Sequence, residues 1–138
     1  MSSDDARLET IDPAGWTKPR GYSNGILAPV GAQILFIAGQ IGWNVQQELV
    51  SDDLIAQFEQ ALRNVLAVVS AADGWPDQIT RMTIYVDDRD AYLAATRELG
   101  AVYRQLMGTH YPAMSLVEVS ALLENGARVE IEATAAIF

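Results

Sequence analysis

Two runs of alternating apolar and polar residues organise the chain, namely YPAMSLVEV at residues 111–119 and VEIEA at residues 129–133. Asn125-Gly126 stands between them. Asn-Gly in such a place is a strong hairpin signal, because both residues tolerate the positive φ of a tight turn. The sequence therefore predicts that the two runs form neighbouring antiparallel strands.

The predicted hairpin has two unlike faces. Because a strand has a period of two, Glu130 and Glu132 share one face of the second run, opposite its apolar residues. In the first run, Met114, Leu116 and Glu118 share a face. A solvated face has no use for methionine and leucine, and a core has none for three carboxylates. The mixed face is therefore predicted to be a pocket or a subunit interface.

Composition limits the class of protein. The 138 residues are enough for one domain with a real core, and half of them are hydrophobic. The absence of cysteine excludes disulfides, thiolate metal sites and a cysteine nucleophile. A net charge of −9 disfavours nucleic acid and anionic membranes as partners.

The N-terminal part is predicted to be an arm, residues 1–21, before a single domain over residues 22–138. Residues 1–5 lack the basic start of a signal peptide, and no apolar run approaches the ~20 residues of a membrane-spanning helix, so a cytoplasmic protein is expected. Pro13, Gly15 and Pro19 are expected to interrupt regular structure in the arm. Trp16 is its one large apolar residue, expected to dock on a subunit surface or flank a pocket.

The intervening segments predict strands over residues 22–28, 33–38 and 79–86. Ser51-Asp52-Asp53 opens a helix that ends before Gly74, and residues 87–90 open a second helix that runs to about Met107. Each helix has one apolar stripe, so both can cover the same face of a mixed sheet, which gives a two-layer α+β sandwich. The other face of the sheet is still apolar, and self-association is the simplest way to cover it.

The C-terminal runs carry a family resemblance. Pro112-Ala113-x-Ser115-x-Val-Glu-Val followed by VEIEA resembles the C-terminal signature of the Rid (YjgF/YER057c/UK114) family, the enamine and imine deaminases. GYS at residues 21–23 and FIAGQI at residues 36–41 agree with it. The resemblance implies a chorismate mutase-like (Rid) fold, a homotrimer, and small-molecule substrate pockets in the clefts between subunits.

The resemblance assigns roles to three residues. Glu130 matches the glutamate that holds the attacking water, and a partly buried carboxylate can both deliver water to carbon and move a proton to nitrogen. The alternative is a solvated or ion-paired strand glutamate, with Arg128 and Glu132 on the same face. Gly39 would offer a backbone polar group to the ligand or simply allow close packing. Tyr22 matches a pocket-wall tyrosine, or is an interface aromatic.

Other candidates are weaker. Trp43 and Leu116 would shape an apolar pocket, although a loop tryptophan can equally be an interface anchor. Ser115 matches a motif serine, but no His-Asp pattern would activate it as a nucleophile. His110, the only histidine, lacks a second ligand in spacing and is interpreted as a loop or contact residue. No metal or cofactor is expected.

Met114 departs from the family pattern. The deaminating members have an arginine there that clamps the substrate carboxylate, and a thioether replaces neither of its charge-assisted hydrogen bonds. Small 2-imino acids are therefore expected to bind poorly unless another cation substitutes. Arg20 is one candidate, although a solvated loop charge is the simpler interpretation.

These residues predict an enamine/imine deaminase whose substrate is larger or less acidic than the short 2-imino acids. A non-catalytic trimer that binds a small ligand in the same cleft is the alternative. The ribonuclease activity ascribed to some family members is a third hypothesis, which the acidic charge and the lack of a basic aromatic stripe disfavour.

Overall fold

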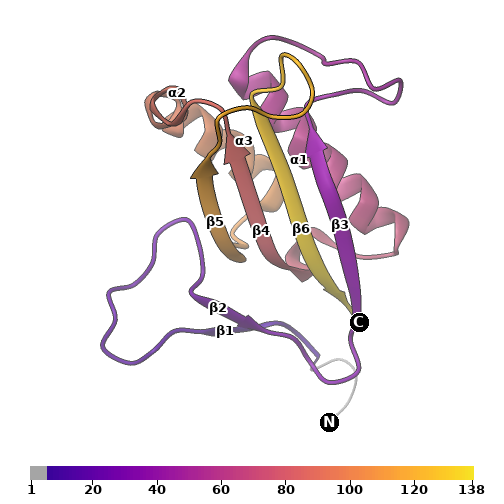
Figure 1. Ribbon diagram of the computed structural model, residues 1–138. Helices are drawn as coiled ribbons and strands as arrows, with labels where there is room; N and C mark the ends of the chain where they lie inside the picture. The colour runs from indigo at the N-terminus through magenta and orange to yellow at the C-terminus, as the bar shows by residue number, and fades with distance from the viewer. Residues whose placement is uncertain (1–5) are drawn as a thin grey trace.

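Four strands form a mixed sheet, and the helices pack on one of its faces (Figure 1). The computed structural model describes residues 6–138. The sheet and its helices confirm the predicted α+β fold. Its elements are β3 (Gln33–Ile41), α1 (Leu54–Ala71), the short 3₁₀ helix η2 (Pro76–Gln78), β4 (Ile79–Val86), α2 (Arg89–Ala94), α3 (Thr96–Met107), β5 (Ala113–Glu118) and β6 (Val129–Ile137).

The order of the strands shows that the predicted hairpin is wrong. The order is β3-β6-β4-β5, so β4 lies between the two C-terminal strands, antiparallel to β6 and parallel to β5. Asn125-Gly126 does form a turn, with a φ of 88° at Gly126. However, residues 119–128 are long enough to cross the end of β4. The apolar strand β4 is largely buried at the centre, whereas β5 is mostly exposed and lies at the edge.

The core lies between the sheet and α1. The side chain of Asp53 caps α1 by accepting a hydrogen bond from the backbone N–H of Ala56 (2.9 Å), as the sequence predicts. The apolar stripe of α1 is buried against the predicted inner face of β6. That core includes Phe58, Leu62, Val65, Val69, Val129, Ile131, Ala133 and Ala135.

The second predicted helix is two helices. The backbone of Ala95, with φ −106° and ψ 11°, breaks the helical path between α2 and α3. The hydroxyl of Thr96 donates to the carbonyl oxygen of Leu93 (3.0 Å), and such local bonds compete with helical ones. Leu93 of α2 is exposed, whereas Leu99 and Tyr103 of α3 are buried.

The N-terminal arm contains a strand that the sequence did not predict. β1 (Glu9–Ile11) pairs antiparallel with β2 (Gly25–Leu27), so Pro13 and Gly15 lie in the connecting loop instead of preventing regular structure. β2 is also shorter than the predicted strand over residues 22–28. Residues 1–5 of the predicted arm lie outside the described residues.

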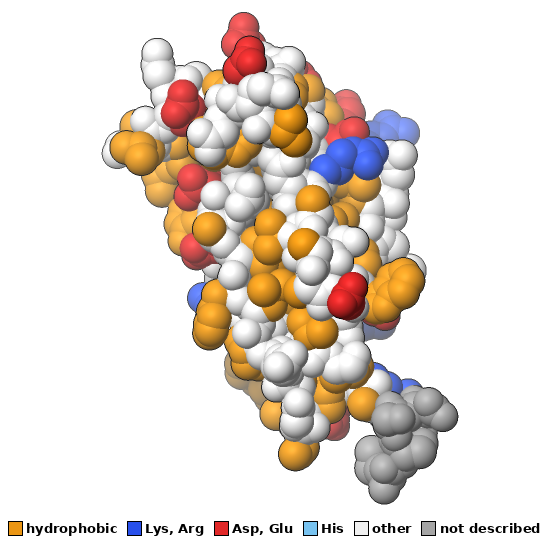
Figure 2. All heavy atoms as spheres, turned by 90° about the vertical axis from the view of Figure 1, so that its right-hand side faces the viewer, with side chains coloured by type: hydrophobic (Ala, Val, Ile, Leu, Met, Phe, Trp, Pro, Cys, Tyr) orange, Lys and Arg blue, Asp and Glu red, His pale blue; other side chains and the backbone are white. Residues whose placement is uncertain are grey.

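The sheet face opposite the helices is open in a single chain. Phe36 of β3 is 79 % exposed and Ile34 is 51 % exposed, whereas Ile37 between the sheet and the helices is buried. Figure 2, a view from the β3 edge of the sheet, shows hydrophobic side chains at the surface of that side of the molecule. The apolar side chains of β3 that point away from the helices are therefore exposed to solvent in a single chain. Within residues 6–138, no helix is long and apolar enough to cross a bilayer.

Candidate functional site

Gly39 and Glu130 meet where β3 and β6 pair irregularly. The register of the two strands shifts between Ile37 and Gln40, which leaves Gly39 in a bulge. A Cβ atom on Gly39 would lie 2.7 Å from both Cδ and Oε2 of Glu130, closer than real Cβ contacts. A side chain at residue 39 would therefore displace the carboxylate of Glu130 from this position. The predicted close approach to the backbone of Gly39 is confirmed, and Glu130 is the group that approaches.

The side chain of Glu130 is half-buried. Its carboxylate makes neither a hydrogen bond nor an ion pair with any other residue in the range 6–138. Arg128, the partner considered in the alternative interpretation, instead lies 3.9 Å from Asp87. Glu132, two residues further, accepts a 2.7 Å hydrogen bond from the hydroxyl of Tyr85. Of these two carboxylates on β6, Glu132 therefore has a hydrogen-bond partner, and Glu130 has none among the described residues.

Tyr85 is a member of this cluster that sequence reasoning missed. It lies opposite Glu130 in the β4–β6 register. The hydrogen bond to Glu132, with burial and the negative charges of both glutamates, raises the pKa of the Tyr85 phenol, so it remains a proton donor. The signal was the alternation of Arg81, Thr83 and Tyr85 with apolar residues along residues 79–86, which places all three on the open face.

A hollow of about 410 Å³ extends along this open face beside the cluster. Both strands that flank β6 contribute to it, and its polar groups come from Arg81, Thr83, Glu132 and Thr134. Phe36 and Ala38 supply its apolar wall. The arrangement combines carboxylates, a phenol and a cation on one face.

A second hollow, of about 230 Å³, lies at the β5 edge. It is lined by Tyr22, Ser23, Asn24, Arg81, Ala113, Met114 and Ser115. Two of the sequence-predicted site residues, Tyr22 and Met114, therefore meet here and not beside Glu130.

The prediction that Met114 and Leu116 share a face of the sheet with Glu130 and Glu132 is wrong. The parallel register pairs Met114 with Met82 and Leu116 with Ile84, and both β4 residues are buried under the helices. The error follows from the hairpin, because β5 takes its register from β4 and not from β6. Met114 packs partly against the core and also lines a hollow of about 200 Å³ between β5 and α3.

The remaining candidates lie apart. Trp43 is half-buried in the loop after β3, where its carbonyl oxygen accepts a hydrogen bond from Nδ2 of Asn64 (2.9 Å). Leu116 is 39 % exposed on the edge strand. Arg20 is exposed and precedes Gly21. Within one chain the candidates form two groups, one along β3 and β6 and one along β5.

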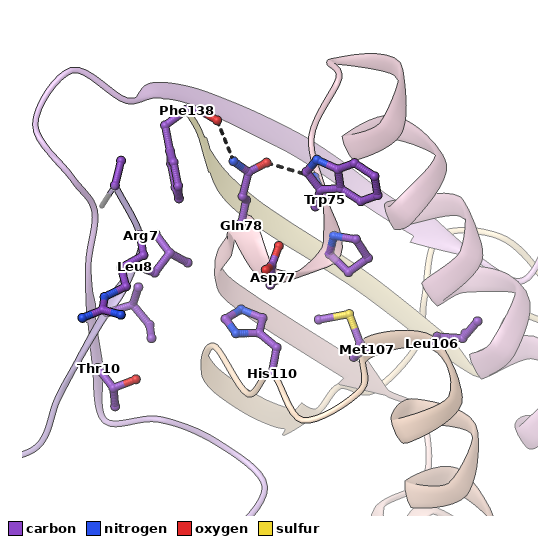
Figure 3. A pocket seen from close by; sticks show the side chains of 13 residues that line it. Arg7, Leu8, Thr10, Trp75, Asp77, Gln78, Leu106, Met107, His110 and Phe138 are labelled. Atoms are coloured by element: carbon purple, nitrogen blue, oxygen red, sulfur yellow. Dashed lines mark hydrogen bonds between the residues drawn. The ribbon is translucent and has the colours of Figure 1, made fainter. Parts of the chain in front are cut away.

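A larger hollow, of about 780 Å³, lies between the N-terminal segment and the body of the molecule. Figure 3 shows Arg7 and Thr10 on one side and Trp75 and His110 on the other. Nε2 of His110 donates to the carbonyl oxygen of Ile79 (2.7 Å), which fastens the loop after α3 to the start of β4. None of the predicted site residues lines this hollow.

Together, the two-layer fold and the motifs at Gly39 and Glu130 define a class of small α+β proteins with polar groups on an open sheet face. The chain belongs to the Rid family: the family model described as endoribonuclease L-PSP matches residues 17–137.

Three relatives illustrate the likeness. A RutC family protein of Pyrococcus horikoshii is 35% identical over 129 residues, which are 92% of this chain and 96% of that protein. The 2-iminobutanoate/2-iminopropanoate deaminase of Salmonella typhimurium is 33% identical over 114 residues, 83% of this chain and 85% of that protein. The crystal structure of a Rid family protein of unknown function from Yersinia pestis has a TM-score of 0.83 at 32% identity, with 95% of this chain and 99% of that chain covered.

Proposed function

We propose that this protein is an enamine/imine deaminase, which hydrolyses a reactive imine to a carbonyl compound and ammonia. The observation that carries the proposal is the contact between Glu130 and Gly39, which leaves a half-buried carboxylate without a structural partner. Named deaminases among the relatives support this reaction class. Glu130 would position the water, and Gly39 would present backbone polar groups to the substrate.

The chemistry needs one group that accepts and returns protons. An enamine first tautomerises to the imine. Glu130 takes a proton from water as the oxygen bonds to the imine carbon, and passes it to nitrogen, which gives a carbinolamine. Glu130 then takes the hydroxyl proton and delivers it to nitrogen as the C–N bond breaks, which releases ammonia and leaves the carbonyl. Because Glu132 accepts a hydrogen bond from Tyr85, Glu130 is the carboxylate that remains free for these proton transfers.

We propose that the complete site lies between copies of the chain in a cytoplasmic homotrimer. Gly39, Trp43 and Glu130 would come from one copy, and Tyr22, Met114 and Leu116 from the next. This division is supported by the separation of the two groups in a single chain. The exposed Phe36 and Ile34 provide an apolar surface for the contact.

Assembly is directly measurable. Light scattering at micromolar concentration should report a trimer, because the bare apolar face of β3 is unfavourable in water. Phe36→Asp should shift the protein towards monomer, and the matched change of the exposed, isolated Leu123 to aspartate should not. A monomeric wild-type protein would contradict the inter-copy site.

The substrate differs from the short 2-imino acids in this proposal. Met114 has no positive charge and lines an apolar hollow together with Leu99 and Tyr111. The methionine favours a larger substrate with an apolar part. The non-catalytic binding trimer is the alternative, supported by the same absence of arginine at residue 114.

Turnover separates enzyme from binding protein. Imines of increasing size would be generated in situ from amino acids by an amino acid oxidase, and the loss of imine would be followed with semicarbazide as a trap. The deaminase accelerates hydrolysis of at least one imine, with greater acceleration for larger ones. No acceleration across the series, with measurable ligand binding, would favour the binding protein.

A further inference from the structure

We propose that Arg81 binds a carboxylate of the substrate, in the hollow that it shares with Tyr22 and Ser115. This inference rests on the proposed deaminase function and names its substrate class: an imine that carries a carboxylate, held by a guanidinium on β4 instead of one on β5. Arg81 would therefore determine specificity from a strand where the family motif places no binding group.

The hollow offers polar groups that have no other partner. Within the described part of the chain, no hydrogen bond or ion pair engages the side chains of Arg81, Tyr22 or Ser115. The other two polar residues of the hollow are occupied. Ser23 donates to the carbonyl oxygen of Tyr111, and Asn24 donates to Asp12 (2.8 Å). A guanidinium and two hydroxyls are thus left to face the same 230 Å³ space.

The charges around the hollow favour an anion. None of its lining residues is acidic. Arg81 also lines the neighbouring hollow that contains Glu132, but Glu132 accepts its hydrogen bond from Tyr85 and makes no ion pair with Arg81. Arg81 is exposed and makes no ion pair with the described residues, so its guanidinium can form charge-assisted hydrogen bonds to a carboxylate.

The position of Arg81 also explains how a carboxylate can be retained despite Met114. Arg81 lies opposite Ala113 in the parallel register, next to the motif position but on the adjacent strand. Met114 packs on the helix side of β5 and Arg81 lies on the open face, so the carboxylate would be held at the open side of the hollow that both residues line.

Benzoate and benzamide test the site, because they have the same ring and differ in charge. Affinities would be measured by NMR titration of the wild-type protein and of Arg81→Met, Arg81→Lys and Arg97→Met. Arg97 is an exposed arginine on α3 and serves as the control for the loss of one charge. We expect wild type to prefer benzoate by about tenfold to hundredfold, the ordinary effect of a hydrogen bond to a charged group. Arg81→Met should abolish the preference, Arg81→Lys should keep part of it, and Arg97→Met should keep all of it.

A rescue variant excludes a merely structural effect. In the double variant Arg81→Met/Met114→Arg, a guanidinium returns to the same hollow from β5, so the preference for benzoate should return. Equal affinity of wild type for both probes would overturn the proposal. So would a preference for benzoate that survives in correctly folded Arg81→Met.

The two proposals can fail separately. If Arg81→Met loses the preference but no imine is hydrolysed by wild type, the carboxylate site stands and the deaminase is rejected. If wild type and Arg81→Met hydrolyse carboxylated imines equally well, the deaminase stands and the role of Arg81 is rejected.

Discussion

Glu130→Gln lowers the rate of imine hydrolysis by roughly 10²–10⁴, the usual contribution of a general acid–base group, and leaves ligand affinity nearly unchanged. Glutamine has almost the same shape as glutamate and still fits against Gly39. Its amide cannot take a proton from water, so the attacking oxygen is no longer activated. The expected loss therefore appears in kcat and not in KM.

Glu132→Gln is the matched control. It makes the same chemical change two residues along β6, in a carboxylate that accepts a hydrogen bond from Tyr85. The glutamine can still accept that bond through its carbonyl oxygen, so the rate should change by less than about tenfold, within the range of lost positioning. Stopped-flow measurement of imine decay would give both rates. Equal turnover by wild type and Glu130→Gln would remove Glu130 from the chemistry.

Local patterns predicted the parts of the fold that depend on neighbouring residues. The Asp53 cap and the stripe of α1 were correct, because capping and helical amphipathicity are properties of a few adjacent residues. The alternation of β6 was also correct, because its buried face is apolar throughout. The break at Ala95 was missed, because a threonine in a helical pattern can point its hydroxyl to solvent or bond the backbone of the preceding turn, and the pattern is the same in both cases.

Strand order could not be obtained from the same patterns. Asn125-Gly126 specifies a turn but not which strands it joins, and the burial of β4 decides that it lies between β5 and β6. The same error put Met114 on the wrong face of the sheet in the prediction, because the pairing of strands decides which residues are neighbours. Arg81 was missed for a related reason: one arginine on a strand has the same sequence pattern whether it is solvated or lines a hollow.

The site itself was predicted one residue at a time. Gly39 and Glu130 were each selected from a motif, but their contact depends on the bulge between β3 and β6. Register shifts of one residue leave little trace in a sequence. The structure adds that the carboxylate and the glycine form a single unit, which is why variants at the two positions are expected to be coupled.

A second large effect is expected at Gln57, a fully buried polar residue of α1. Its Nε2 donates to the carbonyl oxygens of Ser51 (2.8 Å) and Gly126 (3.0 Å). Its Oε1 accepts from the backbone N–H of Arg128 (2.8 Å). One amide therefore ties the helix to the turn at Gly126 and to the segment that leads into Glu130.

Gln57→Leu should lower the free energy of unfolding by roughly 2–4 kcal/mol, because leucine fills the space but three part-buried hydrogen bonds to backbone groups are lost, each worth about 0.5–1.5 kcal/mol. Gln60→Leu is the control: the same change in the same helix removes only the half-buried bond to Asn64 and should cost less than about 1 kcal/mol. Urea unfolding at equal protein concentration would measure both. Hydrogen exchange should also show loss of protection around residues 126–128 in Gln57→Leu alone, since the released segment is no longer held against α1. Equal unfolding midpoints for the two variants would show that the three bonds of Gln57 contribute no more than an ordinary helix-surface contact.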